Sequence, residues 1–233
     1  MSATAADGSF GDTPPQPGGP GHRRAVARVF VAVDVGDAVR AEAGRVVRVL
    51  TGKLEAAKVP PRITWVSPAS LHVTVRFIGE VDETAVAGLC DKLAPPIPMP
   101  PFEVEWRGLG VFPSAKHPRA LWLGVVSGGA ALGALEAEVS RRLAGTIDPE
   151  ARPLLPHLTI GRVKMSGSGI DWPKLLQAVE VRGVRSVVDR VTLYRSDRLP
   201  PFGRPRAAAG GVEGQRGPHY TGLVSAPLIA DTA

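Results

Sequence analysis

Cysteine is almost absent from this 233-residue sequence, which contains only Cys90. A single thiol excludes an internal disulfide and a cysteine-built zinc site. This usage fits a reducing compartment, so we expect a cytoplasmic protein. Apolar runs of the ~20 residues that a membrane-spanning helix needs are also lacking. We therefore expect no association with a membrane.

Aromatic residues are scarce, at 5%, while hydrophobic residues make up 44% and charged residues 21%. The last two values are ordinary for a globular protein. Metal-binding clusters of carboxylates are not apparent, so we expect neither a metal ion nor a cofactor. The net charge of +6 is compatible with an anionic partner such as nucleic acid. Charge alone is weak evidence, because an Arg-, Ala- and Gly-rich composition can reflect genome bias.

Three segments lack the apolar residues needed to offset the entropy of ordering. Residues 1–27 are expected to form a disordered tail, and Arg23-Arg24 is not followed by a convincing export signal. Residues 229–233 form a second tail, and residues 28–228 form one domain. Within it, residues 199–218 are a long loop or insertion. This loop contains three arginines, which could contact RNA or could belong to a disordered insertion. They are Arg204, Arg206 and Arg216.

Strand-like and helix-like patterns alternate along the domain. Strands are predicted over residues 28–35, 63–66, 71–78, 102–109, 120–127, 156–163, 187–194 and 220–226. Helices are predicted over residues 38–57, 82–93, 130–144 and 171–181. The segment "APPIPMPP" at residues 94–101 is interpreted as a stiff connector. The alternation, together with a strand pattern that occurs twice, indicates an α/β (α+β) fold with two similar lobes.

Two of the predicted strands contain the same pattern of a histidine, an apolar residue, a threonine and an apolar residue. The two copies are His72-Val73-Thr74-Val75 and His157-Leu158-Thr159-Ile160. Because alternate side chains of a strand share a face, each histidine lies beside its threonine while the apolar residues face the core. Opposed lobes would then place two imidazoles and two hydroxyls around one cleft.

Such a site suits phosphoryl chemistry. One neutral imidazole can accept a proton while the other, as imidazolium, donates one. The threonine hydroxyls can bind the non-bridging phosphate oxygens. Two alternatives are that the histidines are structural, or that they bind zinc together with His117 or an acidic residue. Two copies in a chain with five histidines favour catalysis over chance.

Strict alternation also makes predictions for three neighbouring residues. It places Arg76 on the face of His72, where it would either contact phosphate or lie solvated at the rim. It places Phe77 in the core. It places Arg162 on the face opposite His157, unless the strand ends or bulges before it.

The sequence resembles the 2H phosphoesterase superfamily, and within it the bacterial and archaeal RNA 2′,3′-cyclic phosphodiesterases, also called 2′-5′ RNA ligases. The resemblance runs from Arg28 to Leu228. It is carried by "RVFVAVDV", "ITWVSPASLHVTVRFIGEV", "FEVEWRGLGVFPS", "ALWLGV", "PHLTIGR" and "VTLYRS". It implies a bilobal fold of two antiparallel-sheet lobes with outer helices around a central cleft. The loop at residues 199–218 is longer than is usual in the family.

The resemblance also implies a function, namely metal-independent hydrolysis of RNA 2′,3′-cyclic phosphate ends to 2′-phosphate, together with reversible 2′-5′ RNA ligation. By position, His72 matches the proton donor and His157 the proton acceptor. Thr74, Thr159 and Arg162 match phosphate-binding residues. The alternative is a non-catalytic protein that binds RNA ends or nucleotides in the same cleft. In either case we expect a monomer whose partner is RNA or an oligonucleotide.

Overall fold

The computed structural model describes residues 25–150, 153–197 and 219–230. Most of the predicted tails and the whole loop at residues 199–218 lie outside these ranges. The first strand begins at Val26, two residues before the predicted start of the domain, and the last strand ends at Ile229. Within the described residues, no helix is long and apolar enough to cross a membrane.

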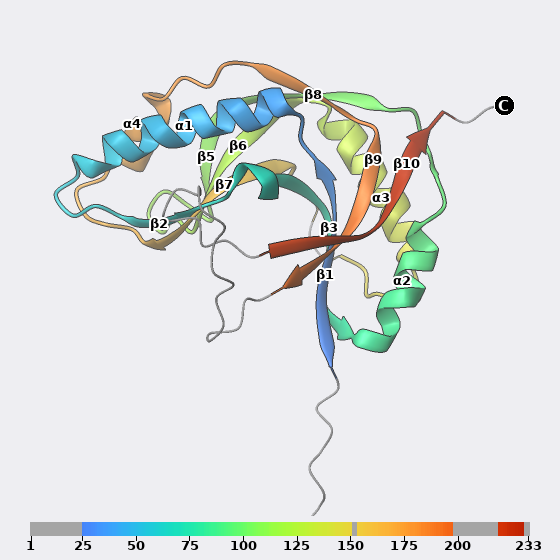
Figure 1. The fold of residues 1–233 in the computed structure, drawn as a ribbon. Helices are drawn as coiled ribbons and strands as arrows, with labels where there is room; N and C mark the ends of the chain where they lie inside the picture. The colour runs from blue at the N-terminus through green and yellow to red at the C-terminus, as the bar shows by residue number, and fades with distance from the viewer. Residues whose placement is uncertain (1–24, 151–152, 198–218, 231–233) are drawn as a thin grey trace, which may run out of the picture.

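The first of two sheets has five strands and carries the first His-Thr strand, β3, at its edge. Its order is β3 (His72–Asp82), β1 (Val26–Asp34), β9 (Arg190–Asp197), β10 (His219–Ile229) and β4 (Ile97–Pro98). Neighbouring strands are antiparallel except for β10 and β4, which pair in parallel. The strands β1, β9 and β10 cross the centre of the molecule (Figure 1).

The second sheet carries the second His-Thr strand and is antiparallel throughout. Its order is β2 (Arg62–Trp65), β7 (His157–Met165), β6 (Ala120–Ser127), β5 (Phe102–Phe112) and β8 (Val184–Val188). Each sheet carries one His-Thr strand, and a helix precedes both: β1, α1 and β2 lead to β3, whereas β6 and α3 lead to β7. The two lobes predicted from the repeated motif are therefore present.

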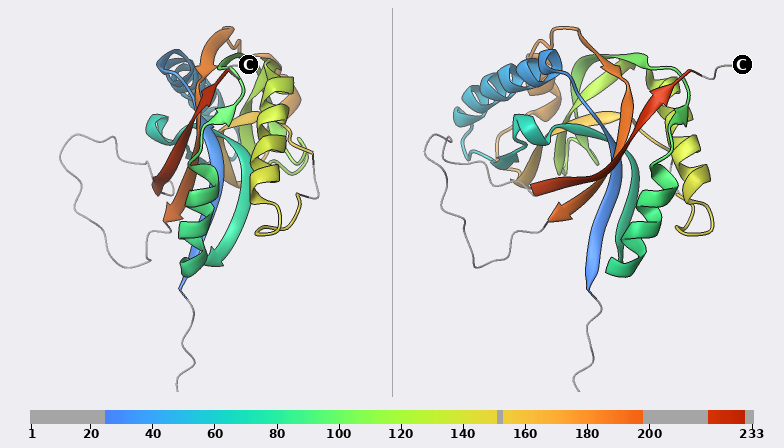
Figure 2. Two further views of the ribbon diagram at one scale, coloured as in Figure 1. Left: turned by 90° about the vertical axis from the view of Figure 1, so that its right-hand side faces the viewer. Right: turned by 45° about the vertical axis from the view of Figure 1, so that its right-hand side comes forward.

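The helices lie outside the two sheets and gather at two ends of the molecule (Figures 1 and 2). At one end, α1 (Asp37–Glu55) contacts β8 and the 3-10 turn η1 (Pro68–Ser70), and α4 (Trp172–Gln177) contacts β5. At the other end, α3 (Gly129–Leu143) contacts β3 and β6. The short helix α2 (Val86–Leu93), entered through η2 (Glu83–Ala85), lies against α3 and β10.

The core consists of aliphatic side chains from both sheets and from the helices. The apolar residues of the two repeated motifs belong to it, since Val73, Leu158 and Ile160 are fully buried and Val75 is nearly so. Burying one such side chain contributes about 1.5–3 kcal/mol. The apolar half of each motif therefore fixes its strand, which leaves the polar half for the opposite face.

Three predicted elements were wrong at the level of tertiary structure. The strand predicted over residues 187–194 is two strands, β8 and β9, which separate at Asp189 and join different sheets. The connector at residues 94–101 contains the short strand β4, which pairs with β10. The helix predicted to extend to Val181 ends at Gln177. For the two strands, pairing with a distant strand rather than local propensity decides the outcome.

Candidate active site

A β-bulge in β3 changes the faces that alternation assigns after Val75. Ala32 on β1 pairs with Thr74, but the next residue, Val31, pairs with Arg76, so Val75 is the extra residue. Arg76 therefore turns away from the motif face and is 4% exposed, whereas Phe77 is 47% exposed. The predictions that Arg76 shares the face of His72 and that Phe77 lies in the core were both wrong for this reason.

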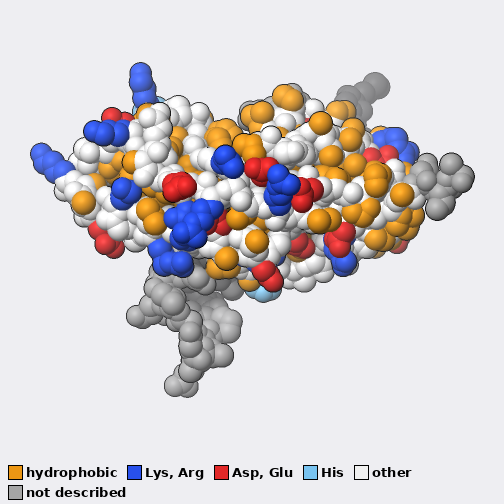
Figure 3. Space-filling model, turned by 90° about the horizontal axis from the view of Figure 1, so that it is seen from above, with side chains coloured by type: hydrophobic (Ala, Val, Ile, Leu, Met, Phe, Trp, Pro, Cys, Tyr) orange, Lys and Arg blue, Asp and Glu red, His pale blue; other side chains and the backbone are white. Residues whose placement is uncertain are grey.

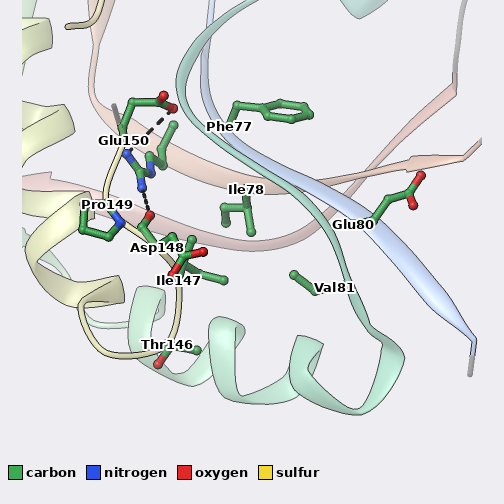
Figure 4. A pocket seen from close by; sticks show the side chains of 10 residues that line it. Phe77, Ile78, Glu80, Val81, Thr146, Ile147, Asp148, Pro149 and Glu150 are labelled. Atoms are coloured by element: carbon green, nitrogen blue, oxygen red, sulfur yellow. Dashed lines mark hydrogen bonds and ion pairs between the residues drawn. The ribbon is translucent and has the colours of Figure 1, made fainter. Parts of the chain in front are cut away.

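Arg76 instead connects the first sheet to the segment that leads into the second motif. Its Nη2 group donates a hydrogen bond to the carbonyl oxygen of Asp148, and its Nη1 atom lies 3.7 Å from Glu136 and 3.8 Å from Glu150. Figure 4 shows the contacts to Asp148 and Glu150 beside a cavity of about 470 Å³, which Arg76 and Phe77 help to line. Neither motif histidine lines this cavity.

A second bulge lies at the equivalent position of β7. The first bulge turns Arg76 away from the motif face, whereas this one turns Arg162 toward it. Thr159 pairs with Trp122, whereas Gly161 pairs with Leu121, so Ile160 is the extra residue. Arg162 is exposed and lies on the same face as Thr159. The sequence analysis made the position of Arg162 depend on a bulge. That bulge is present, and Arg162 lies on the face of the second motif.

Both imidazoles are held by the same hydrogen bond. Nδ1 of His72 lies 2.8 Å from the carbonyl oxygen of Ser70, and Nδ1 of His157 lies 2.7 Å from that of Leu155. A carbonyl oxygen only accepts, so each Nδ1 carries the hydrogen. Nε2 is then the atom that gains or loses a proton in each ring.

Aromatic rings pack against both imidazoles. The ring centroid of Phe30 lies 4.9 Å from that of His72, and Tyr220 approaches His72 edge-on at 5.0 Å. Phe112 approaches His157 edge-on at 4.9 Å. These contacts limit rotation of the imidazoles and keep part of each ring away from water.

The electrostatic surroundings of His72 connect the two lobes. Burial lowers the pKa of His72, while its hydrogen bond to Ser70 and the carboxylate of Asp34 act in the opposite direction. Arg162 and His157, both on β7, lower the pKa further. The structure thus brings His72 within electrostatic range of two candidate residues from the other sheet. The two threonines share the faces of their histidines.

Two residues beside His72 were missed by the sequence analysis. Asp34 on β1 is the direct strand partner of His72, and both oxygens of its carboxylate accept from the Tyr194 hydroxyl, at 2.8 and 2.9 Å. Burial, together with the hydrogen bond to Asp34, raises the pKa of Tyr194 to about 12. A charged residue near the end of the apolar strand "VFVAVDV" was the available signal for Asp34. No local signal links Tyr194, 160 residues later, to it.

The alternative that the histidines bind zinc requires a set of metal ligands, and the described part of the chain contains none. No three His, Cys, Asp or Glu side chains cluster there as a metal site would require. His117, the histidine considered as a further ligand, is exposed in the connection between β5 and β6.

Two curled, mainly antiparallel sheets, each with one His-x-Thr strand, define a 2H-phosphoesterase-type fold. The model of the 2′-5′ RNA ligase superfamily matches residues 37–200, and the chain belongs to this superfamily. The resemblance stated from the sequence is thereby confirmed.

Relatives with assigned names support the same grouping. A protein of Thermotoga maritima named RNA 2′,3′-cyclic phosphodiesterase is 30% identical over 174 residues, which cover 74% of this chain and 88% of the relative. A protein of Methanothermobacter thermautotrophicus with the same name is 31% identical over 185 residues, covering 74% and 91%.

Solved structures agree with the fold. TT0787 of Thermus thermophilus is 25% identical, with a TM-score of 0.57, over 88% of this chain and 99% of the other. Escherichia coli LigT complexed with 3′-AMP is 22% identical, with a TM-score of 0.58, over the same shares of the two chains.

Proposed function

We propose that the protein hydrolyses RNA 2′,3′-cyclic phosphate ends to 2′-phosphate by acid–base catalysis between His72 and His157. The observation that carries the proposal is the matched pair of Nδ1 hydrogen bonds, which makes Nε2 the titrating atom of both rings. The relatives named as RNA 2′,3′-cyclic phosphodiesterases support the substrate class and the prediction of an enzyme.

In the proposed reaction, Nε2 of His157 accepts a proton from water while the water oxygen attacks phosphorus. The bond between phosphorus and the 3′ oxygen breaks, and His72 donates its Nε2 proton to that oxygen. The products are a 2′-phosphate and a free 3′-hydroxyl. Exchange with solvent then returns both histidines to their starting protonation states.

Thr74, Thr159 and Arg162 are proposed to bind the non-bridging oxygens, where negative charge increases in the transition state. The exposed Arg162 side chain, placed on this face by the bulge at Ile160, offers a fork of donors that suits phosphate. The same groups would serve ligation, in which a 5′-hydroxyl replaces water as the nucleophile, the 3′ oxygen again leaves with the proton from His72, and a 2′-5′ linkage forms.

We further propose that the protein acts as a monomer in the cytoplasm on RNA or oligonucleotide ends. The positive net charge favours an anionic partner. On the face seen in Figure 3, however, Lys and Arg side chains are interspersed with acidic and hydrophobic ones. This face therefore offers no continuous basic track for a long RNA.

The test is turnover of a nucleoside 2′,3′-cyclic phosphate in the presence of EDTA, with the product identified by ³¹P NMR. We expect full activity and a 2′-nucleotide. Loss of activity with EDTA, or a 3′-nucleotide as product, would contradict the mechanism. Binding without turnover of any cyclic nucleotide or oligonucleotide would favour the alternative, a protein that binds RNA ends without catalysis.

A further inference from the structure

The placement of Asp34 presents an electrostatic problem. Its Cα pairs with that of His72 across β1 and β3, so the two side chains lie on the same face of the sheet. This is the face on which an anionic phosphate is proposed to bind. A carboxylate there repels the phosphate unless a positively charged group beside it offsets the negative charge.

We propose that Asp34, held by the Tyr194 hydroxyl, is a positioning residue that stabilises the imidazolium form of His72 and so maintains it as the proton donor. The inference rests on the proposed function and adds to it a group that favours the protonated form of His72, against the burial that lowers the pKa of this residue. The Tyr194 ring lies stacked 6.3 Å from the His72 ring, which places the hydroxyl–carboxylate pair next to the imidazole.

The groups around His72 explain why a carboxylate is needed there. Burial disfavours the imidazolium, and two groups on β7 disfavour it further, namely Arg162 and the protonated form of His157. On β10, Tyr220 contributes a neutral ring edge. Asp34 on β1 is the anionic side chain that acts against these effects, together with the carbonyl oxygen of Ser70.

Further charges surround the pair formed by Asp34 and Tyr194. Asp189 raises the pKa of Arg190, and Asp34 contributes a smaller effect in the same direction. Arg40, on α1, slightly opposes the rise in the pKa of Tyr194, which burial and Asp34 cause. The raised pKa keeps the hydroxyl protonated through the range in which histidines titrate, so it remains a donor to the carboxylate.

The role predicts a specific dependence on pH for Asp34→Asn. Removing the charge shifts His72 toward its neutral form, which leaves the rate unchanged at acid pH, where His72 is protonated in either protein. The deficit in kcat/KM then grows with pH and levels off at about threefold to tenfold, since one pKa unit corresponds to a factor of ten.

Other roles give different profiles. A purely structural role would lower the rate by the same factor at every pH. If His72 were instead the base, Asp34→Asn would raise the relative rate at low pH. Either outcome would overturn the inference. Asp91→Asn, which removes an exposed carboxylate from α2, is the matched control and should keep the wild-type profile.

A second measurement does not depend on turnover. Titration of ¹³C-labelled histidine by NMR, with the His72 signal assigned by its loss in His72→Gln, should give a lower His72 pKa in Asp34→Asn than in the wild-type protein. An unchanged titration of His72 overturns the inference even if the enzyme is active. Conversely, wild-type protein that binds but does not turn over cyclic phosphates contradicts the proposed function, and the titration still decides whether Asp34 stabilises the imidazolium.

Discussion

His72 and His157 make the same hydrogen bond, in which each Nδ1–H donates to the carbonyl oxygen of the residue two positions earlier. The repeated spacing means that two separate strands orient their imidazoles in the same way. Either ring can therefore accept or donate a proton through Nε2. The surroundings, rather than the motif, must decide which one acts as the acid.

Removal of either imidazole should abolish most of the activity. We expect His72→Ala and His157→Ala each to lower kcat by about two to four orders of magnitude, the usual range for one general acid or base. His117→Ala changes an exposed histidine away from the motifs and should keep the wild-type rate. A folded His72→Ala protein with near wild-type turnover of a 2′,3′-cyclic nucleotide would exclude the paired-histidine mechanism.

The two threonines should contribute less than the histidines. Thr74→Ala and Thr159→Ala each remove one hydroxyl donor, so we expect losses of about tenfold to a thousandfold in kcat. Thr74→Ser and Thr159→Ser keep the hydroxyl and should recover most of the rate. Equal losses for the Ala and Ser variants would mean that the methyl group, and not the hydroxyl, is what matters.

The bulge at Ile160 leads to a prediction for two neighbouring cations on β7. Arg162→Met should lower kcat/KM by about tenfold to a thousandfold, because it removes donors to the phosphate. Lys164→Met removes the same charge from an exposed position two residues later and should change kcat/KM little. Similar effects of the two substitutions would indicate a general electrostatic contribution rather than a phosphate contact at Arg162.

Arg76 should affect stability and not chemistry. Arg76→Met removes the hydrogen bond to Asp148 and the positive charge that pairs with Glu136 and Glu150. We expect the free energy of unfolding to fall by about 1–3 kcal/mol, with kcat retained in the folded protein. Arg107→Met, at a position 63% exposed, is the comparison and should cost about 0.5 kcal/mol or less. Urea unfolding measures both values.

The pH optima of kcat/KM and kcat should differ. In the free protein burial lowers the pKa of His72, so its protonated form is lost at a lower pH than for an ordinary histidine. Bound phosphate favours the imidazolium, so kcat should form a bell with its maximum roughly between pH 6 and 8 and above the optimum of kcat/KM. A rate that climbs steadily through pH 9 would indicate hydroxide or metal-bound water as the nucleophile.

The free energy of unfolding should also depend on pH through His72. Because the folded protein binds a proton at His72 less readily than the unfolded chain does, stability from this group is complete above about pH 6.5. It is lost as the pH falls through the lower pKa of the folded state. His72→Gln should therefore reduce the loss of stability between neutral and acid pH in phosphate-free buffer. An unchanged slope would show that burial does not disfavour the charged imidazole.

The sequence by itself determined the faces of the two short motifs. A histidine and a threonine two residues apart in an apolar strand must share a face, because burial of Val73 and Leu158 fixes the opposite one. The two-lobed mixed fold followed from the alternation of strand and helix patterns, and Arg162 was correctly left dependent on a bulge.

Only the tertiary structure decided which way the side chains point after the third residue of each motif. The bulges at Val75 and Ile160 depend on how β3 and β7 pair with their neighbours, and the residues themselves do not signal them. One bulge buries Arg76, and the other turns Arg162 toward the second motif. Asp34 and Tyr194 likewise meet only because β1 lies between β3 and β9. Local side-chain chemistry sets strand alternation, whereas strand pairing sets where it breaks and which distant groups meet.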